Sequence, residues 1–292
     1  MRIEAVASYL MPQSSSIMRS APVFMYHHVN QNKGDMVTVS PDVFEAQMRF
    51  LKEAGYRTLN ADELVAFAGG NLAIKEKAVA ITFDDGYLDN YVYAFPILKK
   101  YNIKAIIFLV VDWVEEASNR VRSQKPAPEC IYRGSGVRSN TIPIPSHHEG
   151  KNMIARGHTH KVIMNWDMIK EMQKSGLIEF YSHTMSHRKC AELSGDELIK
   201  ELKDSKRIIE ENLNTPCPYL CWPKGSHKED SIEAAKEAGY KALFTTKRGI
   251  VKKGSDRFSI ERIVVKNNIG WFKNRVRIYT SPLLSKIYLA IR

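Results

Sequence analysis

Short apolar runs alternate with longer amphipathic segments along most of this chain. The runs are rich in β-branched and aromatic residues, which is typical of buried strands. The pattern predicts strands at 22–26, 56–59, 78–83, 104–110, 177–181, 219–222, 241–245 and 260–265.

Helix signals occupy the intervals between these strands. Ser40 and Pro41 supply a cap and a first-turn proline, Gly55 ends that helix, and Ser194 with Glu197 forms a capping box. Further helices are expected at 61–68, 88–101, 165–175 and 228–238. Because strands that alternate with helices pair in parallel, we predict an α/β fold. A (β/α) barrel of about eight strands is favoured, and a doubly wound open sheet is the alternative.

One stretch, 115–161, interrupts the alternation because prolines and glycines break its periodicity. A loop of this length inside a compact domain is usually functional or disordered. We expect a lid or substrate-binding arm; a plain surface loop and a second metal site are the alternatives. The second alternative rests on four histidines, His147, His148, His158 and His160. The rest divides into an N-terminal extension at 1–19, a main domain at 20–265 and a basic amphipathic segment at 266–292.

The composition permits a sizeable core, since 44% of the 292 residues are hydrophobic. No run approaches the ~20 apolar residues of a spanning helix. The N-terminus lacks the basic start and long apolar run of a secretory signal. The four cysteines form no C-x-x-C pair, which indicates reduced thiols. We therefore expect a cytoplasmic protein.

The formal net charge of +11 is concentrated near the C-terminus, because no acidic residue follows Glu261. Basic residues there mix with aromatic and aliphatic ones, a pattern that suits an anionic membrane surface. We expect peripheral contact with the inner face of the cytoplasmic membrane through 266–292. A core-packing helix with a charged outer face is the alternative, and nucleic acid is not expected as a partner.

Candidate chemistry gathers where predicted strands end. Asp84 and Asp85 follow the strand at 78–83, His27 follows 22–26, and His183 follows 177–181. In a barrel, functional sites lie at these carboxyl ends. If a helical turn begins near His183, His187 shares its face. Two histidines and one carboxylate are ligands that suit zinc and other late divalent ions.

This interpretation explains why two aspartates stand side by side. One would bind the ion and the other would stay free as a base, and the cation would offset their mutual repulsion. A solvated turn for the two aspartates and a structural role for the two histidines are the alternatives.

The motifs TFDDG and SHTMSH together resemble those of the NodB-type polysaccharide deacetylases, carbohydrate esterase family 4. FMYHHV and the segment from Thr38 to Tyr56 resemble the poly-β-1,6-N-acetylglucosamine deacetylase branch. The resemblance covers about residues 20–265 apart from the inserted stretch. It implies a distorted (β/α) barrel of about seven to eight parallel strands. It also implies hydrolysis of the acetamide of an N-acetylated amino sugar.

Roles follow from the resemblance at the matching positions. Asp84 would be the general base, and Asp85, His183 and His187 would bind one divalent ion, zinc with cobalt or nickel as alternatives. His27 is our candidate for the general acid, and Asp84, once protonated, is the alternative. The candidates for lining the substrate groove are Tyr87, Trp222, Pro223 and Lys224, and core packing is the alternative for Trp222.

The chain departs from the family pattern at two motifs. The third motif, R-x-P-[FY]-G, reads CWPKG at 221–225, so Cys221 replaces the arginine that helps to hold the base. The L-x-H motif that supplies a general-acid histidine is not evident. We therefore expect Asp84 to be less well anchored, unless Lys224 or another cation substitutes.

These observations favour a metal-dependent N-deacetylase acting on a lipid-linked sugar or a lipopolysaccharide precursor in bacterial envelope biosynthesis. A deacetylase of poly- or oligo-N-acetylglucosamine is the first alternative. An amidohydrolase of a non-sugar amide and a degenerate sugar-binding protein are the others.

Overall fold

Seven parallel strands close into a barrel in the computed structural model, which describes residues 20–123, 144–281 and 284. Each strand pairs in parallel with its neighbours, and the ring closes because β2 pairs with both β12 and β6. The strands, in spatial order, are β2 (Val23–Tyr26), β12 (Ile260–Val264), β10 (Ala242–Arg248), β9 (Tyr219–Cys221), β8 (Ile178–Ser182), β7 (Ala105–Leu109) and β6 (Ala78–Phe83). The predicted barrel is confirmed and the open sheet is excluded.

The strand predicted at 56–59 forms only a short addition to this ring. β5 (Arg57–Thr58) pairs with β6 alone. Two further pairs of short strands lie outside the ring, β1 (Ser20–Ala21) with β11 (Val251–Lys252) and β3 (His28–Val29) with β4 (Thr38–Val39).

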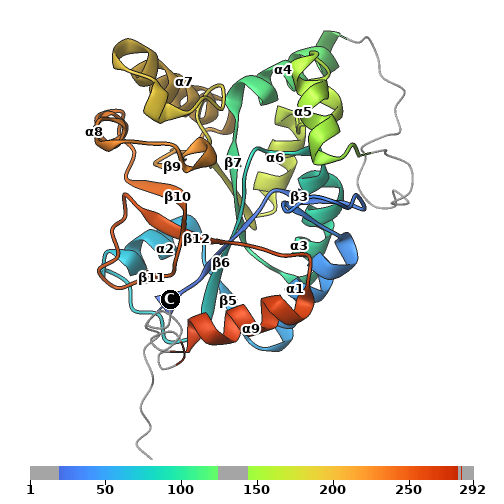
Figure 1. Cartoon of the computed structure of the whole chain (residues 1–292), viewed down its shortest axis with the longest axis vertical. Helices are drawn as coiled ribbons and strands as arrows, with labels where there is room; N and C mark the ends of the chain where they lie inside the picture. Colours follow the sequence, from blue (N-terminus) through green and yellow to red (C-terminus); the bar gives the residue numbers. More distant parts are fainter. Residues whose placement is uncertain (1–19, 124–143, 282–283, 285–292) are drawn as a thin grey trace, which may run out of the picture.

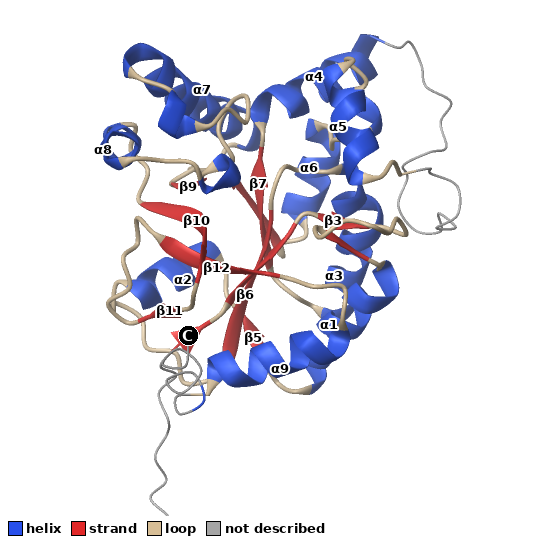
Figure 2. Cartoon of the chain, viewed as in Figure 1, coloured by secondary structure: helices blue, strands red, loops and turns tan. Residues whose placement is uncertain are grey.

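Helices surround the barrel (Figures 1 and 2). They are α1 (Pro41–Glu53), α2 (Ala61–Ala68), α3 (Phe95–Tyr101), α4 (Val111–Ser123), α5 (His147–Ala155), α6 (Trp166–Lys174), α7 (Gly195–Leu213), α8 (Glu229–Glu237) and α9 (Ile269–Thr280). Of these, α1, α2, α3, α6, α7 and α8 fall where the alternating pattern predicts helices. A π-helical turn at Asn90–Ala94 precedes α3, so the helix predicted at 88–101 is not regular throughout. None of the helices in the described part of the chain has the length and apolar character needed to span a membrane.

Where the structure describes it, the inserted stretch is more regular than its sequence indicates. α4 begins at Val111 and continues to Ser123, and α5 lies inside the stretch that was expected to be a loop. Prolines and glycines in and around α5 hid that helix, whereas α4 contains neither residue type and was missed because the break in periodicity was placed too early, at 115. The N-terminal extension at 1–19 lies outside the described residues.

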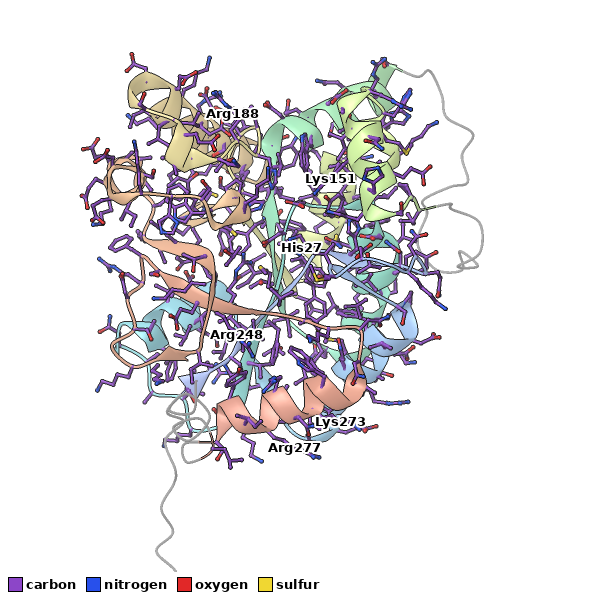
Figure 3. All side chains as sticks on the ribbon, in the orientation of Figure 1. His27, Lys151, Arg188, Arg248, Lys273 and Arg277 are labelled. Carbon is purple, nitrogen blue, oxygen red and sulfur yellow. The ribbon has the colours of Figure 1, made fainter. Side chains whose placement is uncertain are left out.

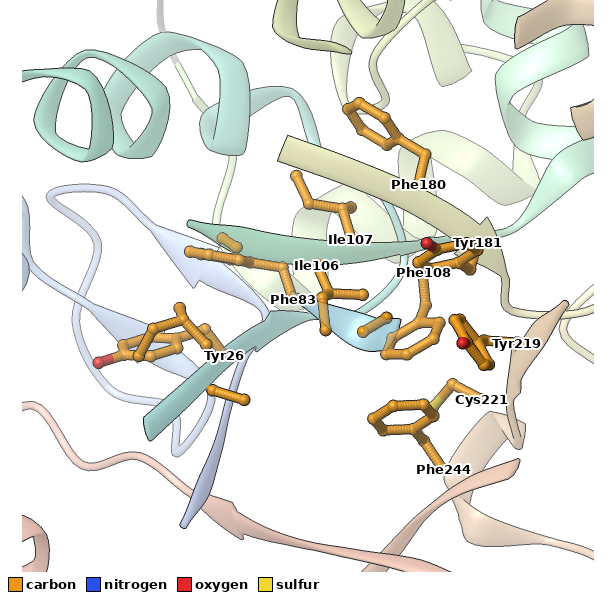
Figure 4. Packing of buried hydrophobic residues seen from close by; sticks show 14 of the residues in the cluster. Tyr26, Phe83, Ile106, Ile107, Phe108, Phe180, Tyr181, Tyr219, Cys221 and Phe244 are labelled. Atoms are coloured by element: carbon orange, nitrogen blue, oxygen red, sulfur yellow. The ribbon is translucent and has the colours of Figure 1, made fainter. Parts of the chain in front are cut away.

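Aromatic residues fill two layers of the core, an inner layer inside the barrel and an outer layer between the barrel and the surrounding helices. Phe108 on β7 and Phe244 on β10 meet across the barrel, with ring centroids 4.8 Å apart. Figure 4 shows these two rings beside Cys221. Tyr26 on β2 stacks on Phe83 and packs against α1, so it belongs to the outer layer.

The C-terminal helix α9 uses its apolar face for this outer layer. Phe272 is fully buried and its ring lies 4.8 Å from that of Phe24, while Val276 and Tyr279 are also buried. Figure 1 shows α9 along the lower edge of the molecule and α4 and α7 at the upper edge. Because α4 starts directly after β7, the carboxyl ends of the strands face the upper edge, away from α9.

Candidate active site

The carboxyl ends of β6 and β8 carry the predicted metal ligands. Both strands pair in parallel with β7, so Asp84 and Asp85 after β6 emerge at the same end as His183 after β8. His27 follows β2, which is the other neighbour of β6. Figure 3 labels His27 near the middle of the molecule. Barrel closure therefore brings together residues that are far apart in sequence.

Asp85, His183 and His187 form one compact cluster. The Asp85 Oδ1 atom lies 3.3 Å from the Nε2 atom of each histidine. Ligand atoms around a tetrahedral zinc ion, at bond lengths near 2.0–2.1 Å, are separated by roughly 3.3–3.4 Å. Asp85 Oδ1 is buried and makes no hydrogen bond to the residues that the structure describes. A buried carboxylate oxygen without a hydrogen bond, facing two imidazoles at this spacing, fits a divalent cation.

The backbone that presents these ligands is irregular. His183 and His187 do not share a helical turn, as the i, i+4 spacing predicted; Thr184 and His187 have φ angles of 67° and 61°. Asp85 has a φ of 74°. Left-handed conformations of non-glycine residues carry strain and cluster at functional sites. The ligands are thus placed by a strained loop and not by helical periodicity.

Hydrogen bonds behind the ligands fix their orientation. His183 donates from Nδ1 to the Cys221 carbonyl at 2.8 Å, which leaves Nε2 free to bind an ion. The buried carboxylate of Glu201 on α7 accepts from the Ser186 amide at 2.6 Å and from its hydroxyl. Glu201 therefore holds the loop between the two histidines.

Asp84 is anchored by an arginine that the sequence analysis did not select. Arg262 on β12 donates from Nη1 to Oδ1 at 2.7 Å and from Nη2 to Oδ2 at 2.8 Å. Both side chains are almost fully buried. Burial alone raises the pKa of Asp84, but the charges of Arg262 and His183 and the hydrogen bonds from Arg262 outweigh it and lower the pKa. Asp84 is thus ionised at neutral pH, as a general base must be.

Arg262 fills the role of the missing motif arginine from another strand. Its Nη2 atom lies 3.0 Å from Cys221 Sγ, and Nε donates to the Thr245 carbonyl at 2.9 Å. Lys224 is exposed and does not substitute. The exception in our expectation therefore applies, because another cation, Arg262, substitutes and anchors Asp84. Two adjacent charged residues, Glu261 and Arg262, inside the otherwise apolar strand at 260–265 were the available signal.

His27 stands beside the base. Its Nε2 atom lies 3.9 Å from Asp84 Oδ2, and the side chain is 19% exposed, so it faces an accessible space. Burial lowers the pKa of His27, while Asp84 and Asp85 oppose this shift. The ring is therefore neutral near pH 7.

The other residues predicted to line the substrate groove differ in their exposure to solvent. Trp222 is 0% exposed and stacks on His227, so its indole presents no surface to a substrate and the packing alternative describes it. Pro223 is buried and Lys224 is exposed. Tyr87 is 1% exposed, and its hydroxyl has no hydrogen-bond partner among the described residues.

The sequence analysis did not select two groups of side chains that lie near the cluster of Asp85, His183 and His187. Trp113 on α4 packs its indole against the His187 ring, with centroids 5.1 Å apart, and is only partly buried. His28 bonds to His147 of the inserted stretch. Among the described residues, neither group of metal-ligating side chains contains a histidine of that stretch, so a second metal site there receives no support.

Comparison with known proteins identifies this arrangement. The barrel and site are those of a hydrolase, and the family model of polysaccharide deacetylases matches residues 72–243, more than half of the chain. The chain belongs to this family. Its members are metal-dependent amide hydrolases that remove N-acetyl groups from sugars, so an N-acetylated sugar is the substrate class.

Curated relatives and a solved structure agree with this family. The chain is 29% identical over 244 residues to the putative polysaccharide deacetylase YxkH of Bacillus subtilis, covering 84% of this chain and 71% of that one. It is 24% identical over 255 residues to poly-β-1,6-N-acetyl-D-glucosamine N-deacetylase of Staphylococcus aureus, covering 84% and 73%. The deacetylase PplD of Streptococcus pyogenes, solved with acetate, superposes with a TM-score of 0.70 at 24% identity over 91% of this chain and 100% of that one.

Proposed function

We propose that this chain is a zinc-dependent N-deacetylase of poly- or oligo-β-1,6-N-acetylglucosamine. One observation carries the proposal. An ionised Asp84, held by Arg262, stands next to Asp85 Oδ1, which faces two imidazoles without a hydrogen bond. The named activity of several relatives supplies the substrate class.

The residues divide the hydrolysis between them. Asp85, His183 and His187 would hold the ion, which supplies Lewis acidity toward the acetyl carbonyl and toward water. Asp84 accepts the proton of the attacking water, because its carboxylate is ionised and held in place. His27, neutral and beside Asp84, is placed to take that proton and pass it to the departing amine. Water and the amide are thereby converted to acetate and a free amine.

The polymer substrate replaces our first expectation of a lipid-linked sugar. The curated relatives are named as deacetylases of a polysaccharide, and none of those names mentions a lipid-linked sugar. The position of α9 also favours a polymer, because α9 lies at the opposite edge of the molecule from the carboxyl ends of the strands. A membrane bound to α9 would lie at the far side of the protein from the active site. The active site would therefore face away from the lipid headgroups of that membrane.

The experiment is acetate release by the zinc-loaded protein. The substrates are a β-1,6-N-acetylglucosamine oligomer, a chitin oligomer and a lipid-phosphate-linked N-acetylhexosamine, with Asp84→Asn as the blank. We expect release from the β-1,6 oligomer. Release from the lipid-linked sugar alone would overturn the polymer assignment. A protein that binds the oligomer and zinc without releasing acetate would be a sugar-binding member.

Contact of the basic C-terminal segment with an anionic membrane at the inner face also stays a proposal. Lys273 and Arg277 stand outward along α9 (Figure 3) and both lie over the Phe50 ring. Removing the whole segment would expose the core that Phe272 covers, so charge removal is the cleaner test. Lys273→Gln with Arg277→Gln should weaken binding to phosphatidylglycerol vesicles, and unchanged binding would contradict the proposal.

A further inference from the structure

A chain of hydrogen bonds links a buried carboxylate to the inserted stretch. Asp89 Oδ2 accepts from His28 Nδ1 at 2.8 Å and from Asn30 Nδ2 at 2.6 Å. His28 Nε2 then lies 3.1 Å from Nδ1 of His147, the first residue of α5. Asp89 and His28 are buried, whereas His147 is half-buried. The chain therefore runs from the interior to an accessible ring.

This chain lies directly beside the catalytic cluster. His28 follows His27, whose ring faces Asp84, and it stacks on Tyr87 with centroids 3.8 Å apart. Tyr87 also contacts His147 edge to face at 6.2 Å. Since Tyr87 lies two residues after Asp85, the His147 ring stands next to the wall of the site.

The part of the inserted stretch from Ile144 onward is fixed firmly enough to place this ring. Asn32 Nδ2 donates to the Ile144 carbonyl at 3.0 Å, ahead of α5. A Cβ atom on Gly150 would lie 3.1 Å from Val162, so α5 packs tightly against the segment before α6. Hydrogen bonds from Leu88 and Met164 join that segment to the loop after β6.

We propose that His147 is a substrate-positioning residue of the deacetylase site, whose Nε2 atom bonds a sugar hydroxyl, and that Asp89 and His28 act through it by orienting its ring. The inference rests on the proposed function. Nε2 has no partner among the described residues, and burial, followed by Lys151, lowers the pKa of His147 to about 4, so the ring is neutral at working pH.

The hydrogen-bond chain defines what His147 can recognise. Asp89 fixes the proton on His28 Nδ1. A neutral His28 then accepts from His147 Nδ1, which leaves Nε2 of His147 as an acceptor. A protonated His28 donates instead, which makes that Nε2 a donor. A hydroxyl complements both states because it donates and accepts, whereas a carboxylate or an ammonium group complements only one.

Replacing His147 by asparagine or by glutamine distinguishes its proposed contact with the substrate from its hydrogen bond to His28. Asparagine places its amide near the position of Nδ1 and keeps the bond to His28. Glutamine places its amide near Nε2 and keeps the substrate contact. The adjacent His148 is exposed and serves as the matched control, as His148→Asn. The probe is the β-1,6-N-acetylglucosamine oligomer, assayed by acetate release and by equilibrium binding to an Asp84→Asn background.

His147→Asn should raise KM and weaken oligomer binding by about three- to tenfold, the effect of one neutral hydrogen bond, with kcat and melting temperature unchanged. His147→Gln should keep KM within about twofold and lower the melting temperature. Wild-type KM in His147→Asn, or an equal effect of His148→Asn, would overturn the inference while the wild-type activity still supports the function. An oligomer that is neither bound nor cleaved would overturn both.

Discussion

Replacing Arg262 by methionine tests how the base is held. Methionine fills much of the same space but removes the cation and its bonds to Asp84, Thr245 and Thr82. The Asp84 carboxylate, 2% exposed, would keep its burial and lose its counter-charge. The effect should therefore appear in both stability and activity.

The stability loss follows from an unpaired buried charge. Removing one partner of a buried ion pair costs about 3–5 kcal/mol, which is a large share of a total stability of about 5–15 kcal/mol. Removing both charges, in Arg262→Met with Asp84→Asn, should cost less than Arg262→Met alone. Arg262→Lys keeps the charge without the paired geometry and should fall between the wild type and Arg262→Met.

The pH dependence has a definite sign. In the wild type the pKa of Asp84 lies below its ordinary value of 3.8. The ion pair therefore stabilises the fold above that pH, and this contribution is lost as the pH falls through the folded pKa. Without Arg262, burial raises the pKa of Asp84, so Arg262→Met should lose less stability at pH 5 than at pH 7.5.

The same shift should appear in turnover. A coupling of about 3 kcal/mol corresponds to about two pKa units. The acid limb of the kcat/KM profile for acetate release should move up by about that amount in Arg262→Met. Urea unfolding at the two pH values and the pH profile are the measurements. An unchanged urea midpoint together with an unmoved acid limb would refute the reasoning.

Three further predictions concern the surroundings of the base. Asp85→Ala should lose both bound zinc and acetate release, whereas Asp84→Asn should lose turnover and keep zinc; metal analysis of the purified variants decides this, and zinc retained by Asp85→Ala would contradict the ligand assignment. Glu201→Gln should weaken zinc affinity by about tenfold or more, because Glu201 holds the histidine loop, and equal affinity by competition with a chelator would exclude that role. Trp113→Ala should raise KM for the oligomer more than it lowers kcat, since the indole flanks His187, and a pure kcat effect would assign Trp113 to the metal ligand alone.

Local sequence patterns predicted much of this protein, and their failures have physical causes. The strands and most helices follow from apolar periodicity, because each element must bury one face. The candidate metal ligands follow from their places after strands. The helix α5 was hidden because periodicity is hard to see among prolines and glycines, whereas α4 was missed because the break in periodicity was placed too early. Trp222 was placed at the groove from its motif, but only packing determines which aromatic residues stay exposed.

The sequence by itself indicated the family, favoured the barrel and supplied the candidate residues for the ion and the base, since the motifs lie next to predicted strand ends. The tertiary structure alone decided what surrounds them. Arg262 reaches Asp84 across 178 positions and His147 reaches His28 across 119. Such pairs depend on barrel closure and on strand register, which local patterns do not encode. A cation lost from one strand can therefore be supplied by another, since a buried carboxylate needs a partner and not a particular position in the chain.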